Sequence, residues 1–233
     1  MTELVLRAEG LHKSFVLHLQ GGVRIPVLRD LALEIHAGEC VVLVGRSGAG
    51  KSTLMRSLYG NYRTNDGRIL IRHQGAMIDL VAAEPRTVLA IRRVTLGYVS
   101  QFLRVVPRVS ALSIVTEALT AIGTELEEAE SRARALLLRL NIPVQLHSLP
   151  PATFSGGEQQ RVNLARGFIG RHPILLLDEP TASLDPANRD VVIGMIHEAK
   201  RSGIAVLAIM HDITARDAVA DRLFAVPALQ DAA

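Results

Sequence analysis

Cysteine is almost absent from this chain, which has 233 residues and a single cysteine, Cys40. One thiol cannot form an internal disulfide, so the sequence is not that of a small secreted domain held together by cross-links. Cys40 also stands at the start of an apolar stretch where a core strand is expected. We therefore expect a protein of a reducing compartment and place it in the cytoplasm.

Long apolar runs are absent as well, although 48% of the residues are hydrophobic. The longest aliphatic runs, such as residues 204–210, are far shorter than the ~18 residues that a membrane-spanning helix needs. Glu3 and Arg7 stand where a signal peptide would have its apolar segment. We expect no direct membrane insertion, so any link to a membrane has to come through a partner.

The chain also lacks a basic block, internal repeats and low-complexity tracts. Its formal net charge is only +3, so nucleic-acid binding is not expected. A chain of this length can bury a sizeable core, yet it lies below the size at which cores usually split. We expect one compact unit, 1–233, with a subdomain.

A phosphate-binding loop is the first motif that is present. Residues 40–44 predict an apolar strand, which runs directly into the pattern GxxxxGK[ST]. In such a loop the glycines bring N–H groups around a β-phosphate, the lysine reaches the β and γ oxygens, and the following hydroxyl suits Mg²⁺. The predicted nucleotide-binding residues are Gly45, Arg46, Ser47, Gly48, Ala49, Gly50, Lys51, Ser52 and Thr53, with Ser52 also on the metal. A glycine-rich turn with an unrelated lysine is the alternative.

A second glycine-rich anion site lies in residues 154–161. Ser155 and Glu158 have the spacing of a capping box, which predicts a helix that begins here. The first free N–H groups of this helix and the positive end of its dipole would face an anion. An ordinary helix cap explains the same residues, but a single nucleotide would rarely need both sites.

Acidic residues follow an apolar run within residues 173–180. Four consecutive aliphatics predict a strand buried on both faces, and open α/β sheets bind ligands at the C-terminal ends of such strands. Asp178 is then expected to hold Mg²⁺, and Glu179 to polarise the attacking water. An acidic turn after a core strand is the alternative.

Two more polar residues follow apolar runs. His211 comes directly after residues 204–210, and we favour a contact with the γ-phosphate over a purely structural role. Gln101 follows residues 94–99 and is assigned to Mg²⁺ or water on its order of appearance alone.

Secondary-structure patterns place these motifs in an α/β chain. Residues 3–100 are predicted to alternate short strands with turns, including a hairpin formed by 69–71 and 77–80. Apolar residues recur at helical spacing within 113–140. Three prolines then break the pattern before the helix at Ser155, and strands alternate with helices after it.

These residues, in this order, resemble the ATP-binding cassette (ABC) ATPases over essentially the whole chain. The resemblance implies that Phe15 stacks on adenine, that Gly45–Thr53 are Walker A and that Gln101 is the Q-loop. It implies that the ATP-binding signature contains Ser155, Gly156, Gly157 and Glu158. It also implies that Asp178 is the Walker B aspartate and Glu179 the catalytic base, that Asp185 lies in the D-loop and that His211 is the catalytic switch histidine. It implies ATP and Mg²⁺ as ligands. A core aromatic after a short strand is the alternative for Phe15.

The implied fold is an α/β P-loop NTPase of the ABC type, with a mixed sheet core, an antiparallel β subdomain and an inserted helical subdomain. The core and β subdomain would take 1–101 and 165–233, and the helical subdomain with the signature would take 102–164. In this family the signature of one subunit covers the ATP of another, which implies an ATP-sandwich dimer with a second copy or with a second ABC ATPase subunit. Phe154 and Glu158 depart from the usual leucine and glutamine, and they put in doubt only the last polar contact across the interface.

A narrower resemblance is carried by residues 22–28, 56–62, 101–112 and 165–169, which look like the L-type ATP-binding subunits of bacterial carbon-phosphorus (C-P) lyase systems. It implies a cassette without a permease, acting on a soluble C-P lyase core complex. That system converts phosphonates to ribose 1-phosphonate 5-triphosphate and then cleaves the C-P bond. The subunit would be its ATP-hydrolysing motor or gate.

The alternative is the motor of a membrane exporter of the lipoprotein or macrolide kind, because residues 157–163 occur there in similar form. The stretch after Gln101, where cassettes dock their partners, predicts an apolar patch of Phe102, Leu103, Val105, Val106 and Pro107 beside Arg104 and Arg108. Such a patch suits a coupling helix or a soluble subunit. A P-loop kinase is disfavoured because it needs no signature helix.

Overall fold

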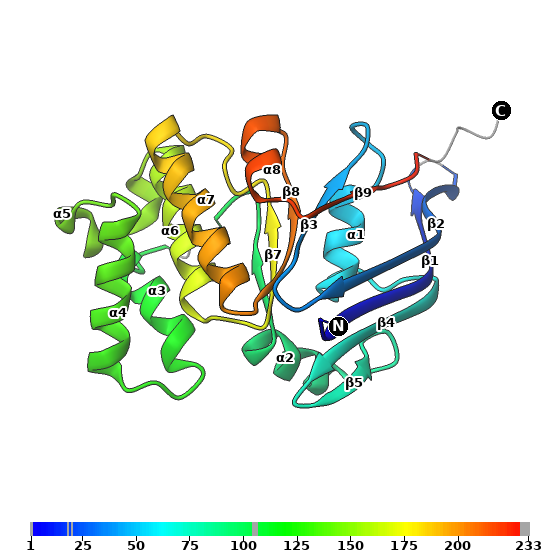
Figure 1. Ribbon diagram of the computed structural model, residues 1–233, viewed down its shortest axis with the longest axis horizontal. Helices are drawn as coiled ribbons and strands as arrows, with labels where there is room; N and C mark the ends of the chain where they lie inside the picture. Colours follow the sequence, from blue (N-terminus) through cyan, green and yellow to red (C-terminus); the bar gives the residue numbers. More distant parts are fainter. Residues whose placement is uncertain (1, 18, 20, 104–106, 229–233) are drawn as a thin grey trace.

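The computed structural model describes residues 2–17, 19, 21–103 and 107–228 and contains two sheets flanked by helices (Figure 1). The strands are β1 (Leu4–Leu17), β2 (Val23–His36), β3 (Cys40–Val44), β4 (Asp66–His73), β5 (Ala76–Asp79), β6 (Leu96–Val99), β7 (Ile174–Asp178), β8 (Ala205–Ile209) and β9 (Arg222–Ala225). The helices are α1 (Lys51–Leu58), α2 (Pro85–Val94), α3 (Ala111–Thr120), α4 (Leu126–Arg139), α5 (Val144–His147), the 3₁₀ turn η2 (Pro151–Thr153), α6 (Gly156–Ile169), α7 (Pro186–Arg201) and α8 (Ile213–Val219).

A five-stranded sheet in the order β6-β7-β8-β3-β9 forms the centre of the molecule, and its pairings are all parallel. Every residue of β7 and of β8 is buried. Parallel strands covered on both faces carry continuous aliphatic runs. The apolar runs of these two strands therefore follow from their position in the sheet.

Neighbouring residues of each central strand face opposite sides of the sheet, as the period of two requires. On one side, Val41 and Leu43 pack with α1 and with the strands of the second sheet. On the other side, Val42 and Leu177 pack with α3, α4, α6 and α7. The two predicted anion-binding helices, α1 and α6, thus lie on opposite faces of one sheet.

The second sheet is antiparallel, in the order β2-β1-β4-β5. The predicted hairpin at 69–71 and 77–80 is confirmed as β4 and β5. The fold class is also confirmed, with the qualification that the two strand directions belong to two separate sheets rather than to one.

The prediction of short strands and turns across residues 3–100 is wrong in two respects. Strands β1 and β2 have 14 residues each and pair as one long ribbon. Helix α2 was not anticipated, because its sequence is rich in β-branched residues, which favour strands. Pro85 at its first position and the burial of Ile91 against the core set it as a helix instead.

The helical spacing in 113–140 corresponds to α3 and α4, with a turn between them. Helix α6 begins at Gly156, as the capping-box spacing predicts, and continues to Ile169. The proposed subdomain boundary at residue 164 therefore falls inside α6. Within the part of the chain that the structure describes, no helix combines the length and the apolar character needed to cross a bilayer.

The packing of α6 on β6 can be tested at Gly167, where an added Cβ would overlap Val99 Cγ2. Overpacking of this kind lowers the free energy of unfolding by about 1–3 kcal/mol, and we expect that loss for Gly167→Ala in a urea titration. Gly194→Ala in α7 is the matched control, because nothing lies within 4 Å of its Cβ position. Alanine at that helix site should stabilise the protein by about 0.5–1 kcal/mol. Equal effects of the two changes would contradict the packing.

Candidate functional site

The register of the central strands places three sequence motifs at one edge of the sheet. Ile209 of β8 pairs with Leu43 of β3 on one side and with Asp178 of β7 on the other. Because these strands are parallel, the chain leaves each of them at the same level. The glycine-rich loop, Glu179 and His211 therefore emerge together, at the edge where open α/β sheets bind ligands.

The loop after β3 turns sharply at Gly50, whose φ of 93° favours glycine. A Cβ there would come within 2.9 Å of Val27 Cγ1 and 3.0 Å of the Val27 carbonyl oxygen. The Lys51 side chain is 9% exposed, and its ammonium donates to the carbonyls of Gly45 at 2.8 Å and Arg46 at 3.0 Å. The loop thus surrounds the Lys51 side chain and holds the positive charge of its ammonium group at the start of α1.

Helix α1 begins without a side-chain cap and has no acidic residue in its first turn. Its first N–H groups and its dipole therefore present a positive end to the loop. Ser52 and the residues from Gly45 to Gly48 are exposed around this end. The geometry is that of a phosphate cradle, which is the chemistry that the loop sequence predicts.

Glu179 has a backbone φ of 56°, which is unusual for a residue with a side chain. Its N–H donates to the Ile209 carbonyl at 2.9 Å, and this contact fixes the turn after β7. One carboxylate oxygen lies 2.8 Å from His211 Nε2, and the Glu179 side chain is 19% exposed against 63% for His211. Backbone strain of this type is concentrated at functional sites. Here it places the mostly buried Glu179 carboxylate against the exposed imidazole of His211.

Asp178 is only 3% exposed, and this burial raises the pKa of its carboxyl group. The Tyr98 hydroxyl donates to it at 3.2 Å, and burial raises the pKa of that phenol to about 12, so it remains a donor. A buried carboxylate with a neutral partner fits a bound cation, because a cation would favour the charged form. The described residues hold no group of three or more His, Cys, Asp or Glu side chains able to cage a metal. A site of this type suits Mg²⁺, which keeps water and phosphate oxygens among its ligands.

The predicted capping box is formed at the start of α6. Ser155 Oγ accepts from the Glu158 N–H at 3.3 Å, and Glu158 Oε2 accepts from Ser155 N at 2.8 Å and Oγ at 2.7 Å. These bonds to Ser155 lower the pKa of the Glu158 carboxyl group. The carboxylate is thus turned to its own helix cap. The helix start is ordered, and Gly156 and Gly157 are the part of it that remains open to a ligand.

The start of α6 touches the loop that follows Glu179. A Cβ on Gly157 would come within 3.0 Å of the Ser183 carbonyl oxygen, so only glycine fits without a shift. Asp185 caps α7 instead of projecting freely, since Oδ1 accepts from Asn188 N at 2.8 Å and Oδ2 from Asn188 Nδ2 at 2.7 Å. These bonds lower the pKa of Asp185.

Phe15 is half-buried on β1 and belongs to neither core cluster. The edge of Tyr62 packs against it with ring centroids 5.4 Å apart, and Lys13 Nζ lies 4.8 Å from its ring centroid. The alternative of a core aromatic is therefore not what the structure shows. Adenine stacking at Phe15 stays a prediction.

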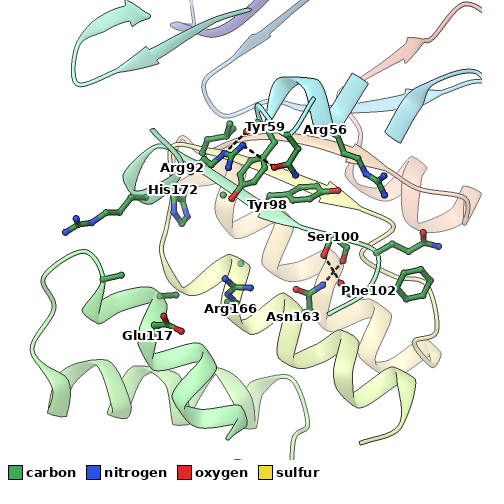
Figure 2. A pocket seen from close by; sticks show the side chains of 18 of the residues that line it. Arg56, Tyr59, Arg92, Tyr98, Ser100, Phe102, Glu117, Asn163, Arg166 and His172 are labelled. Carbon is green, nitrogen blue, oxygen red and sulfur yellow. Dashed lines mark hydrogen bonds between the residues drawn. The ribbon is translucent and has the colours of Figure 1, made fainter. Parts of the chain in front are cut away.

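Gln101 is one of the residues that line a groove of about 760 Å³. Figure 2 shows this groove with ten of its other lining residues labelled. None of the hydrogen bonds found among the described residues joins Gln101 to Asp178 or to the loop around Lys51. Phe102 stands beside it with 75% of its surface exposed, as predicted. Leu103 is 8% exposed and packs in the core, so its assignment to the exposed patch is wrong. Arg104, Val105 and Val106 lie outside the described residues.

The groove is polar and mostly cationic. Residues from α1, α2, β6, α3 and α6 line it, and its charged side chains are Arg56, Arg92, Arg93, Arg166 and Glu117. Asn163 of α6 donates to the Ser100 carbonyl at 2.6 Å and so anchors the segment before Gln101. No sequence signal marks Asn163, Tyr98 or Asn188, because each lies inside an apolar or helical pattern and makes its contacts with residues distant in the sequence or within a helix cap.

A family model described as ABC transporter matches residues 28–182, more than half of the chain. The chain belongs to the ABC transporter ATPase family. A lipoprotein-releasing system ATP-binding protein LolD of Ruegeria is 37% identical over 91% of this chain and 91% of its own length. A macrolide export ATP-binding/permease protein MacB of Sodalis glossinidius is 35% identical over 91% of this chain but only 31% of its own length.

Solved structures agree with this assignment. The dimeric post-hydrolysis state of the ATP-binding cassette MJ0796, bound to ADP and Pi, has a TM-score of 0.86 and 26% identity, covering 95% of this chain and 94% of that one. The chain is thus an ABC ATPase domain with ATP hydrolase activity. The relatives carry the names of lipoprotein-release and macrolide-export proteins rather than of C-P lyase subunits, so the resemblance to that system is supported only at the level of the ABC family.

Because Asp178 is buried, replacing it should lower ATP hydrolysis without lowering the stability of the folded protein. The folded-state pKa of Asp178 is raised, so its carboxyl group favours the fold at low pH, and that contribution is lost as the pH rises through this pKa. Asp178→Asn removes the buried charge and should leave the nucleotide-free protein at least as stable at pH 7. Mg²⁺-dependent ATP hydrolysis should fall by about 10²-fold or more, because a metal ligand is lost. Thermal melting with and without Mg-ATP, paired with phosphate release, measures both. A less stable variant with normal hydrolysis would contradict the assignment.

Proposed function

We propose that this cassette hydrolyses ATP with Glu179 as the general base and His211 as the donor to the γ-phosphate. The contact of 2.8 Å between Glu179 and His211 at the edge of the sheet is the observation that carries this proposal. A water between Glu179 and the γ-phosphate would give its proton to the carboxylate as it attacks phosphorus, and the bond from phosphorus to the β–γ bridging oxygen would break, so that ADP leaves with that oxygen. An N–H of the His211 imidazole, released from its contact with Glu179, would stabilise the phosphoryl oxygen on which negative charge grows. Lys51 would hold the β and γ oxygens from the other side.

The metal would be held by Ser52 and Asp178, with Gln101 as a third candidate. When bound, Mg²⁺ would neutralise the negative charge of the phosphate oxygens. The Tyr98 hydroxyl would help to orient Asp178, to which it donates a hydrogen bond. In this proposal the side chains position the nucleotide and the metal and polarise the attacking water.

The second anion site supports a pair of cassettes. Helices α1 and α6 lie on opposite faces of the sheet, so one nucleotide on one chain does not meet both helix starts. A second copy rotated by a two-fold axis would bring its Gly156 and Gly157 to the ATP on Lys51. The dimeric structure of a cassette that this chain matches over 95% of its length favours self-pairing.

The groove beside Gln101 is where we place the protein that the cassette drives. An exposed aromatic, Phe102, at the rim of a concave surface has the character of an interface anchor. The names of the relatives favour a membrane exporter of the lipoprotein-release or macrolide type, with the cassettes on the cytoplasmic side. ATP binding and hydrolysis in the pair would then move the exporter.

A second candidate partner, the soluble C-P lyase core complex, is favoured by one observation. Three of the four stretches that carry that resemblance, 56–62, 101–112 and 165–169, contribute residues to this groove. They include Tyr59, Phe102 and Arg166, in the surface that a partner would touch. In that setting the same cassette pair would act as a motor or gate for phosphonate breakdown.

Hydrolysis is tested by Glu179→Gln, which keeps the shape of the side chain but removes the base. We expect Mg-ATP binding to survive and turnover to fall by roughly 10²–10⁴-fold, measured by phosphate release. The variant should also form a stable pair in ATP but not in ADP, because the γ-phosphate is no longer consumed. Wild-type turnover by Glu179→Gln would remove Glu179 from this role.

The partner is tested by reversing charge in the groove with Arg93→Glu and Arg166→Glu. Like-charge repulsion and lost pairing should weaken partner binding at least tenfold, about 1.4 kcal/mol, while ATP hydrolysis by the isolated chain stays unchanged. Arg132→Glu with Arg134→Glu on exposed α4 makes the same charge change away from the groove and should have no effect on the partner.

In cells, loss of lipoprotein or macrolide export with the groove variant would support the exporter. Loss of growth on a phosphonate as sole phosphorus source would support the C-P lyase complex. If the groove variant and the α4 control behave alike in both assays, the groove is not the docking site.

A further inference from the structure

A buried asparagine joins the signature side of the molecule to the loop that carries the catalytic base. Asn188, 5% exposed, lies in the first turn of α7. Its backbone N–H and its side-chain Nδ2 both donate to Asp185, at 2.8 and 2.7 Å. Its side-chain oxygen accepts from Asn141 Nδ2 at 2.9 Å. The amide is thus held in one orientation by groups on both sides.

Asn141 belongs to the other side of this contact. It follows the end of α4 and has a φ of 54°, a left-handed conformation that asparagine tolerates better than most residues. Its carbonyl faces Arg161 NH2 of α6, 3.5 Å away. A continuous line of polar contacts therefore runs from α6 through Asn141 and Asn188 to Asp185.

Two more contacts join the same elements near the start of α6. Gln160 Nε2 lies 3.4 Å from the Glu179 carbonyl oxygen. Gly157 packs so closely on the Ser183 carbonyl that a Cβ would lie 3.0 Å from it. The start of α6 is thus held against the segment 179–188 directly at two points, and at a third point through Asn141.

We infer that Asn188 is a positioning residue that couples the two ATP sites of a cassette pair. This inference rests on the proposed pairing, in which α6 of one chain meets the ATP of its partner while Glu179 of that chain serves its own ATP. When the partner's γ-phosphate draws α6 toward it, the line through Asn141 and Asn188 moves the Asp185 loop, and Glu179 at its start, with it. Each site thereby senses whether the other holds ATP, through packed groups that shift as one body.

Asn188→Ala and Asn141→Gly test the inference. The first removes the central amide, and the second removes the amide that faces it while keeping a residue suited to the positive φ, so a folding defect in one variant leaves the other informative. The measurement is phosphate release against ATP concentration, together with ATP binding to the isolated chain. We expect the Hill coefficient to fall from about 2 in the wild type to about 1 in both variants, with ATP binding to the isolated chain unchanged.

Arg139→Gln is the matched control, because it cuts another link between α4 and α7. Arg139 forms a bidentate pair with Glu198 at 2.6 and 2.7 Å, remote from Asp185. The control should keep the cooperativity of the wild type. A cooperative wild type with equally cooperative Asn188 and Asn141 variants would overturn the inference, as would an equal loss in the control. A wild type that neither pairs in ATP nor shows cooperativity would instead overturn the proposed pairing.

Discussion

The burial of one parallel sheet on both faces is the constraint from which the catalytic arrangement follows. Strand β8 pairs with β3 and with β7, so Ile209 is level with both Leu43 and Asp178. This register brings the phosphate loop, Asp178, Glu179 and His211 to one edge. The same burial raises the free energy of the charged form of the Asp178 carboxyl group, and a cation bound there would offset that cost. Because neighbouring side chains of a strand face opposite sides of the sheet, α1 and α6 lie on opposite faces. In the proposed pair, α6 of one chain meets the nucleotide bound at α1 of the other.

The parts that could be predicted from the sequence are those set by local rules. The phosphate loop, the capping box at Ser155 and the aliphatic runs of β7 and β8 each depend on residues within a few positions of one another, and the structure places them as expected. Helix α2 and the burial of Leu103 were missed because packing against distant elements decides them. The contact of Asn188 with Asn141 depends on a hydrogen bond between residues far apart in the sequence, which no spacing rule specifies.

The proposed docking groove is a different part of the surface from the proposed catalytic site. Glu179 and His211 follow strands β7 and β8, whereas the groove is lined by residues of α1, α2, β6, α3 and α6, several of them arginines. Relatives named after lipoprotein release and macrolide export align with 91% of this chain at 35–37% identity, while three of the four stretches that resemble the C-P lyase subunit contribute residues to the groove. We propose that the groove is the surface that distinguishes the two candidate partners.

In the proposed pair, each ATP is enclosed by the phosphate loop of one chain and the signature helix of the other. Mixing two inactive variants tests this arrangement most directly: Lys51→Ala, which removes the phosphate lysine, and Gly157→Asp, which blocks the helix start. In a mixed pair one site contains both changes and the other contains neither. An equimolar mixture should recover activity, up to about a quarter of the wild-type rate, because half of the pairs are mixed and each has one intact site. A mixture no more active than the two variants measured separately would contradict the shared site.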